Sequence, residues 1–236
     1  MDNGRPTGAA SSAALPQGFR SRLLEGLTPS EIEAVLAVAR QQSISPDEAL
    51  RQEGDTASYL SLLVTGLAAF YKTTPEGRKL FLRWIAPGDA FGLAALLQIQ
   101  QPYFLTTDAI CEGCLFVWDQ VSAHALASRI PRLRENAYTI AGDYLTSLVD
   151  ALVVRSSQTA QQRIARALVE SARYASRAGS KGIELALTNE QLAQIADVSL
   201  FTVSHQLSEW QSQGILTKSR GKIVLHAPKR LGSQHS

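Results

Sequence analysis

The side chains whose types and spacing could do chemistry gather near the end of the chain, in residues 199–205. Three hydroxyls, a histidine and a phenylalanine lie within these seven positions. Hydroxyls hydrogen-bond to the edges of DNA bases, and an aromatic ring can contact a thymine methyl group. Two nearby cations, Arg220 and Lys222, could neutralise phosphates. We therefore expect nucleic-acid contacts from Thr188, Ser199, Phe201, Thr202, Ser204, His205, Arg220 and Lys222.

Other reactive side chains do not form a recognisable site. Cys111 and Cys114 make a C-x-x-C pair, but an iron–sulfur cluster needs four thiolates and one chain supplies two. The histidines, including His124, do not follow a metal-binding spacing. A redox pair is one interpretation of the cysteines, and Cys114 as a core residue of a strand is the preferred one. Because we find no Ser/His/Asp group, nucleotide-binding loop or acid pair, we expect no catalytic residue, no metal site and no enzymatic activity.

Residues 188–214 have the pattern of two short helices joined by a turn, which would hold the polar side chains in place. Thr188 can cap the first helix and Ser199 the second, since their hydroxyls accept hydrogen bonds from free N–H groups of the first turn. Apolar residues at steps of four and three turn one face of the second helix inwards: Val203, Leu207 and Trp210. Residues 218–226 suggest a small hairpin. This pattern predicts a helix–turn–helix with a wing, and the alternative is an ordinary pair of packed helices.

Charge is divided unevenly along the chain, although the net charge is only +2. The part from Arg155 onward has 11 Lys and Arg against 5 Asp and Glu, a net of +6, so the preceding part carries a net of −4. A basic C-terminal third indicates an anion-binding module. Double-stranded DNA is the leading partner, and a solvated basic surface is the alternative.

Short β-prone runs alternate with turn signals from residue 43 to residue 118, at a spacing of about ten residues that is typical of an antiparallel sandwich, roll or barrel. The segment 75–77, Pro-Glu-Gly, predicts a hairpin. Further turn signals are Glu-Gly-Asp, Val-Thr-Gly, Ala-Pro-Gly-Asp and Cys-Glu-Gly, at residues 53–55, 64–66, 86–89 and 111–113. A short amphipathic helix precedes this region, with Thr28 and Glu31 as its capping pair.

Residues 133–157 predict one long helix, about 37 Å in length when fully helical. The stretch contains no proline, and its apolar residues recur at steps of three and four. A narrow apolar stripe on so long a helix usually packs against a partner, and packing against its own domain is the alternative. We expect homodimerisation through Ala141, Tyr144, Leu145, Leu148 and Leu152.

The first 18 residues are rich in small residues, Gly and Pro, and predict a disordered lead-in rather than a secretory signal. No apolar run approaches the length of a transmembrane helix, so we expect no membrane association. With two cysteines and no export signal, the expected location is the reducing cytoplasm.

In the order of its motifs the chain resembles the CRP/FNR family, the cAMP-receptor and fumarate–nitrate regulators of bacteria. The resemblance covers residues 20–228 and rests on four pieces in the family's order: YLSLLVTGLAAFYKTTPEGRKLFLRWIAPGDAFG, the A-x-x-x-x-C-L-F-V-W segment, the long helix and LTNEQLAQIADVS with its following helix. It implies an α+β fold with a cyclic-nucleotide-binding-type antiparallel β-roll at 19–130, a dimerisation helix at 131–157 and a winged helix–turn–helix at 158–236. It further implies a homodimer on a two-fold-symmetric DNA site, which could also contact RNA polymerase.

The roll departs from the cAMP-binding members of the family. Those members hold the phosphate with Phe-Gly-Glu and Arg-Ser motifs; here Leu93 replaces the Glu, and Tyr103 and Phe104 occupy the Arg-Ser positions. Because none of these side chains supplies a cation, we do not expect cAMP or cGMP to bind. The expected pocket could take a neutral ligand or haem, or be filled by its own side chains, and no cofactor is predicted. Its residues are Phe91, Gly92, Leu93, Tyr103 and Phe104.

The second helix of the DNA-binding region also departs from the family's common pattern. Phe201 and His205 replace a Glu and an Arg that contact bases in many members, so the operator preference should differ. The leading hypothesis is a homodimeric transcription regulator that responds to an unidentified effector other than cAMP or acts without one. The alternative is an effector- or protein-interaction module whose helix–turn–helix has lost specific DNA recognition.

Overall fold

The computed structural model describes residues 15–77, 79–97, 100–174, 178–179, 182–219 and 221–232. The chain divides into two compact units. The first contains the residues up to Thr73 together with Arg83–Leu148, and the second contains Thr74–Leu82 together with the chain from Val149 onward. Most of the expected lead-in, residues 1–14, lies outside the described residues. None of the described helices is both long and apolar enough to cross a lipid bilayer.

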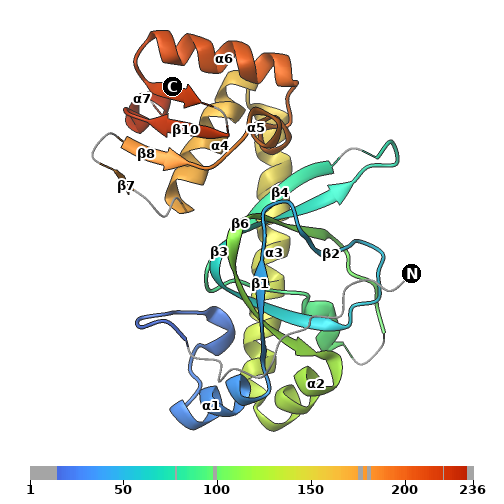
Figure 1. The fold of residues 1–236 in the computed structure, drawn as a ribbon. Coiled ribbons are helices and arrows are strands. Elements are labelled where there is room, and N and C mark those ends of the chain that lie inside the picture. The colour runs from blue at the N-terminus through green and yellow to red at the C-terminus, as the bar shows by residue number, and fades with distance from the viewer. Residues whose placement is uncertain are drawn as a thin grey trace. The chain divides into compact units, whose positions relative to one another are not determined.

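An antiparallel six-stranded sheet forms the β-roll (Figure 1). Its strands are β1 (Arg40–Ile44), β2 (Ala49–Arg51), β3 (Tyr59–Thr73), β4 (Lys79–Ile85), β5 (Ala90–Phe91) and β6 (Thr106–Asp119). Strands β1, β6, β3 and β4 are neighbours in that order, while β2 pairs with β6 and β5 pairs with β3. The predicted antiparallel roll is confirmed, as is the predicted hairpin that joins β3 to β4.

Gly66 of β3 and Gly113 of β6 face each other where the two longest strands kink. The sequence predicts a turn at each glycine, and both predictions are wrong, because β3 and β6 continue through these positions with shifts in register. A Cβ atom on Gly66 would lie 2.7 Å from the Glu112 carbonyl oxygen, and one on Gly113 would clash with the carbonyl oxygen of Thr65. Glycine within a strand therefore marks a bulge and a close backbone approach here.

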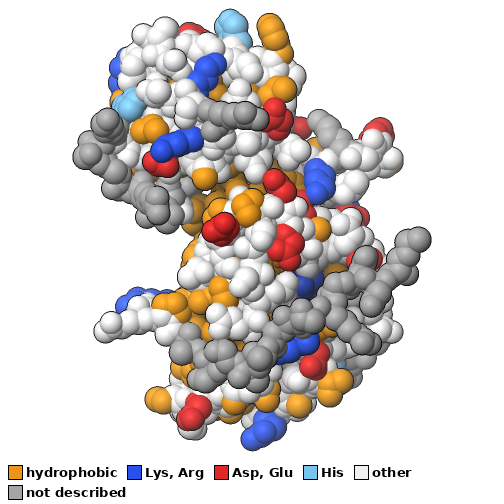
Figure 2. Space-filling view, viewed as in Figure 1, with side chains coloured by type: hydrophobic (Ala, Val, Ile, Leu, Met, Phe, Trp, Pro, Cys, Tyr) orange, Lys and Arg blue, Asp and Glu red, His pale blue; other side chains and the backbone are white. Residues whose placement is uncertain are grey.

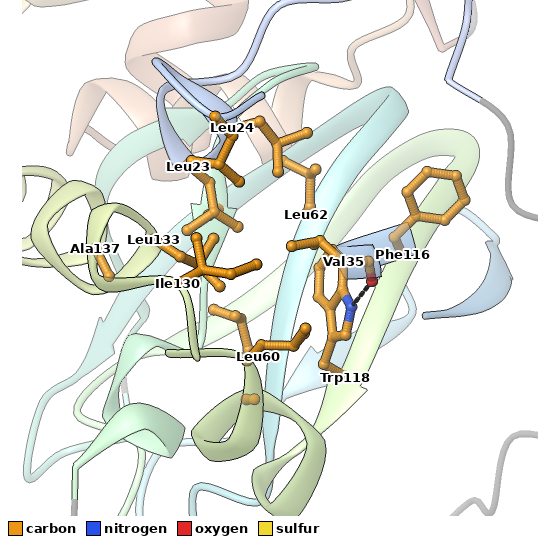
Figure 3. Close-up of a cluster of buried hydrophobic side chains, with 14 of the residues drawn as sticks. Leu23, Leu24, Val35, Leu60, Leu62, Phe116, Trp118, Ile130, Leu133 and Ala137 are labelled. Carbon is orange, nitrogen blue, oxygen red and sulfur yellow. Dashed lines mark hydrogen bonds between the residues drawn. The ribbon is translucent and has the colours of Figure 1, made fainter. Parts of the chain in front are cut away.

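Helices close the roll around a buried core (Figure 3). They are a 3-10 turn (Arg22–Leu24), α1 (Pro29–Ala37), a second 3-10 turn (Leu93–Leu96), α2 (Gln120–Arg129) and α3 (Pro131–Ser157). The core joins Leu60 and Leu62 of β3 to Leu133 and Ala137 in the first half of α3. The α1 capping pair forms as predicted. The indole Nε1 of Trp118 donates a hydrogen bond of 2.8 Å to a carbonyl oxygen of α1, which ties β6 to that helix.

The second unit holds the helix–turn–helix. Its elements are α4 (Ala160–Tyr174), β7 (Ala178–Gly179), β8 (Gly182–Leu185), α5 (Asn189–Ala196), α6 (Leu200–Ser212), β9 (Leu216–Ser219), β10 (Lys222–Leu225) and α7 (Pro228–Gly232). The strands form an antiparallel sheet in the order β7-β8-β10-β9. The predicted helix pair and wing are confirmed. β7 and β8 pair antiparallel, with Ala178 opposite Ile183 and Gly179 opposite Gly182.

Candidate functional site

Two side-chain caps determine where α5 and α6 begin. The Thr188 hydroxyl accepts a hydrogen bond of 3.1 Å from the backbone N–H of Gln191, whose side-chain oxygen accepts one of 2.9 Å from the N–H of Thr188. The Ser199 hydroxyl accepts a hydrogen bond of 3.0 Å from the N–H of Thr202. These bonds satisfy N–H groups that have no partner within the helix. The caps therefore hold the start of α6 in one conformation.

The outward face of α6 presents Phe201 and His205 to solvent. Phe201 is 80% exposed, His205 is exposed, and Thr202 is partly exposed. Figure 2 shows a histidine and hydrophobic side chains standing out along the edge that α6 forms in Figure 1. Ser204 is turned toward α5, because its hydroxyl accepts a hydrogen bond of 3.4 Å from Nδ2 of Asn189. The opposite face of α6 is fully buried through Val203, Leu207 and Trp210.

Arg163 of α4 supports the turn between α5 and α6. Its guanidinium donates to the carbonyl oxygens of Ala196 at 2.9 Å, Asp197 at 3.2 Å and Gln158 at 3.0 Å. Asp197 ends α5 with a left-handed φ of 52°. The planar guanidinium of Arg163, with several donors in fixed positions, thus stabilises the turn that sets the orientation of α6 relative to α5. The role of Arg163 is not predictable from the sequence, because backbone carbonyl partners leave no pattern in residue types.

The wing adds basic side chains beside α6. Lys222 of β10 forms an ion pair of 2.6 Å with Glu184 of β8, and Arg220 lies outside the described residues. Lys218 of β9, which the sequence analysis did not single out, donates from Nζ to the Ser208 hydroxyl of α6 at 2.8 Å. Lys218 is therefore the wing cation that the structure places directly against α6.

The apolar residues of α3 point in two directions. Tyr138 and Leu145 are 61% and 65% exposed. Tyr144, expected at the dimer seam, instead faces the roll: its hydroxyl donates to the Ala90 carbonyl, and its ring meets Phe70 edge-on with centroids 5.4 Å apart. Burial raises the pKa of Tyr144 above its ordinary value. Adjacent positions on a helix lie about 100° apart, so Leu145 can face outward while Tyr144 faces the roll.

The other expected seam residues also differ in their surroundings. Ala141 is exposed and Leu148 is half-buried. The side chain of Leu152 lies outside the described part of α3. The exposed stripe in the described first half of α3 therefore runs through Tyr138, Ala141 and Leu145.

A cavity of about 420 Å³ lies in the first unit, between the roll and α3. Four of the five expected pocket residues line it, and Phe91 is fully buried without belonging to the lining. The lining residues from the expected set are Gly92, Leu93, Tyr103 and Phe104. The wall from α3 consists of Ala137, Tyr138, Ala141, Tyr144, Leu145 and Leu148. The walls are therefore mostly apolar.

A cation, Arg51 of β2, lines this cavity. Its guanidinium donates to the Leu50 carbonyl and the Ser61 hydroxyl, and it lies over the rings of Tyr59 and Phe91 at 5.3 and 5.8 Å. Its Nε is buried without a hydrogen-bond partner, and burial lowers the pKa of Arg51. Leu93, Tyr103 and Phe104 supply no cation, as the sequence predicts, but Arg51 brings one to the same cavity. Arg51 lies in β2, far before the Phe-Gly-Glu and Arg-Ser positions in the chain, so those motifs do not reveal it.

Within the described residues, no group of three or more His, Cys, Asp or Glu side chains, the cysteines and His124 included, could hold a metal ion. Cys111 and Cys114 are half-buried free thiols in β6, so Cys114 is not the core residue that the sequence favours. Burial raises the pKa of the Cys111 thiol, which disfavours the metal-binding thiolate. His124 belongs to α2 and does not line the cavity. The cavity lining contains no histidine, cysteine or methionine, so its residues do not fit haem ligated by those side chains.

Known proteins share both halves of this architecture. Residues 41–129 match the cyclic nucleotide-binding domain family, and residues 162–233 match the Crp-like helix-turn-helix domain family. An anaerobic regulatory protein from Haemophilus influenzae is 24% identical over 192 residues, which cover 79% of this chain and 72% of that protein. A fumarate and nitrate reduction regulatory protein from Yersinia pestis is 25% identical over 192 residues, with 79% and 74% covered.

The fold is also similar to solved structures. FixK2 from Bradyrhizobium japonicum superposes with a TM-score of 0.70 and 27% identity, covering 84% of this chain and 98% of that chain. In this chain the matched cyclic nucleotide-binding domain precedes the matched helix-turn-helix domain. With both domains matched in that order, the chain belongs to the CRP/FNR family of transcription regulators, which are DNA-binding proteins and not enzymes.

Proposed function

We propose that this regulator binds a two-fold-symmetric double-stranded DNA site as a homodimer, with the outward face of α6 in the major groove. The observation that supports this proposal most is the exposure of Phe201 and His205 on a helix that Ser199 caps. In helix–turn–helix proteins the N-terminal residues of the second helix meet base edges. Phe201 offers an apolar contact to a thymine methyl group, and a His205 ring nitrogen can donate to a guanine acceptor.

Phosphate contacts in this proposal come mainly from the wing. Lys218 lies against α6, where it can reach the DNA backbone beside the bases that α6 contacts. Lys222 adds to this basic edge, although Glu184 competes with phosphate for it. Arg220, which lies outside the described residues, is a further proposed phosphate contact. Such contacts strengthen binding to all sequences and make it depend on salt concentration.

The homodimer in this proposal forms through the exposed stripe of α3, at Tyr138, Ala141 and Leu145. A second copy would remove these apolar side chains from water, and the small side chain of Ala141 permits close approach of the two helices. The dimer would act in the cytoplasm, where it could also contact RNA polymerase.

Binding of purified protein to genomic and random DNA fragments over a range of salt concentrations tests this proposal. We expect some genomic fragments to be bound at salt concentrations that release random fragments. Lys218→Met should weaken binding to all fragments alike and lower the salt slope by about one. Equal affinity for all fragments, with no effect of Lys218→Met, would instead support a protein-interaction module that uses the exposed Phe201.

A further inference from the structure

We propose that the cavity of the first unit binds an organic monocarboxylate with an apolar body, and that Arg51 neutralises its carboxylate group. The inference names the effector class of the regulator. An effect of this ligand on DNA binding rests on the proposed function. Binding of the ligand itself does not, because the binding site lies wholly within the first unit.

Arg51 is a buried cation whose position favours binding of an anion. Within the described residues no carboxylate forms an ion pair with Arg51, and its Nε has no hydrogen-bond partner. A buried cation without a counter-charge is costly, and the contacts with Tyr59 and Phe91 offset only part of that cost. A planar guanidinium matches the geometry of a carboxylate and can donate two parallel hydrogen bonds to it. A carboxylate bound in the cavity would supply the missing counter-charge.

The remaining walls of the cavity favour a ligand whose part beyond the carboxylate is apolar. The α3 wall and the segment from Leu93 to Leu97 supply mainly aliphatic and aromatic side chains. The Tyr103 hydroxyl is already occupied, because it donates to the Tyr59 carbonyl at 3.2 Å and accepts from the Tyr59 N–H at 2.9 Å. The Tyr144 hydroxyl is occupied by Ala90. A volume of about 420 Å³ lies in the range of small-molecule sites, about 300 to 1,000 Å³.

Two other occupants fit these walls less well. A cyclic nucleotide carries one negative charge, but its ribose and base would find few free polar partners among the lining residues. A second copy of the chain packed on Tyr138 and Leu145 would cover part of the lining with apolar side chains. That contact would leave the charge of Arg51 without a partner. Dimerisation alone therefore does not explain why a buried arginine lines this cavity.

Calorimetric titration of the full-length protein, without DNA, tests this inference. The probes are decanoate and 2-naphthoate as linear and aromatic carboxylates, decanol as the uncharged counterpart, and cAMP. We expect at least one carboxylate to bind, and decanol and cAMP to bind about tenfold or more weakly. Whichever carboxylate binds more tightly shows whether the apolar body is a chain or a ring.

Variants at two arginines show whether carboxylate binding depends on the charge that lines the cavity, at Arg51, or on a nearby charge outside it, at Arg40. Arg51→Met should weaken carboxylate binding about tenfold or more while leaving decanol binding unchanged, and Arg51→Lys should retain part of the affinity. Arg40→Met is the matched control, because Arg40 also lies over the Tyr59 ring, at 5.6 Å, but does not line the cavity. It should bind carboxylates as the wild type does, and thermal melting shows whether each variant is folded.

Three results would overturn the inference: no binding of either carboxylate, equal carboxylate affinity in wild type and folded Arg51→Met, or cAMP binding tighter than both carboxylates. If Arg51→Met does not fold, the other two variants decide. The inference would be overturned if Arg51→Lys bound carboxylates as tightly as the wild type while Arg40→Met bound them more weakly. Since the titration contains no DNA, these results are independent of whether the protein binds an operator.

Discussion

At the scale of single residues, Phe201 should read a base through apolar contact. Phe201→Ala should reduce the preference for thymine at one operator position by about 1–3 kcal/mol, because the thymine methyl loses its partner. Binding to single-base variants of a selected operator measures this preference. Val121→Ala is the control, since Val121 is also 80% exposed but lies on α2 of the first unit. An unchanged preference at every position in Phe201→Ala would contradict the assignment.

His205 should also affect which base is preferred, and not only how tightly DNA binds. His205→Ala should relax discrimination at one position by about 1–3 kcal/mol, since the base loses a hydrogen-bond partner. The same set of operator variants measures this change, and Lys218→Met provides the contrast of a uniform loss. If His205→Ala weakens all sequences equally, the histidine contacts only phosphate or water.

The residues that the sequence could predict are those whose role follows from local spacing. Thr188 and Ser199 are capping residues with a fixed distance to their helices, and both caps form. Arg51 and Arg163 were missed because their roles depend on partners brought together by the fold. Tyr144 was assigned to the wrong face, because apolar steps of three and four cover more than one side of a helix.

At the scale of elements, the start of α6 should depend on its cap. Ser199→Ala should lower the free energy of unfolding of the second unit by about 1 kcal/mol, since the Thr202 N–H loses its acceptor. Chemical denaturation followed by circular dichroism measures this loss. Ser199→Asn is the control, because Asn also caps helices, and it should be close to wild type. Equal destabilisation by both variants would show that Ser199 has a role other than capping.

The α3 stripe should hold two copies together. Leu145→Glu places like charges at the seam and removes an apolar contact, so the dimer dissociation constant should rise about tenfold or more. Sedimentation at micromolar concentrations measures the oligomeric state. Thr139→Glu is the control, as it adds the same charge on the same helix about 120° away from Leu145. A monomeric wild type, or equal effects of both variants, would contradict this interface.

Most elements were predictable because each has a strong local pattern, such as the caps and the apolar period of the helices. The two longest strands were not, since Gly66 and Gly113 have the composition of turns and only their mutual contact shows a bulge. Residue types that mark a turn also mark a close backbone approach, and sequence alone does not separate the two.

At the scale of the whole molecule, the chain combines a first unit that contains a ligand-sized cavity with a second unit that presents a capped, outward-facing helix. Residues of α3 take part in both the cavity wall and the proposed dimer stripe, notably Tyr138, Ala141 and Leu145. A ligand that touches these side chains and a second copy that packs on them would each affect the other's binding.

Selection of random double-stranded DNA by the purified protein, followed by sequencing of the bound fragments, tests the central claim most directly. We predict enrichment of an inverted repeat whose half-sites lie about one helical turn apart, roughly 34–36 Å, or a multiple of that distance. Two α6 helices related by a two-fold axis would produce this pattern. Enrichment of no motif, or of a single unrepeated half-site by a protein that is dimeric under the same conditions, would contradict the account.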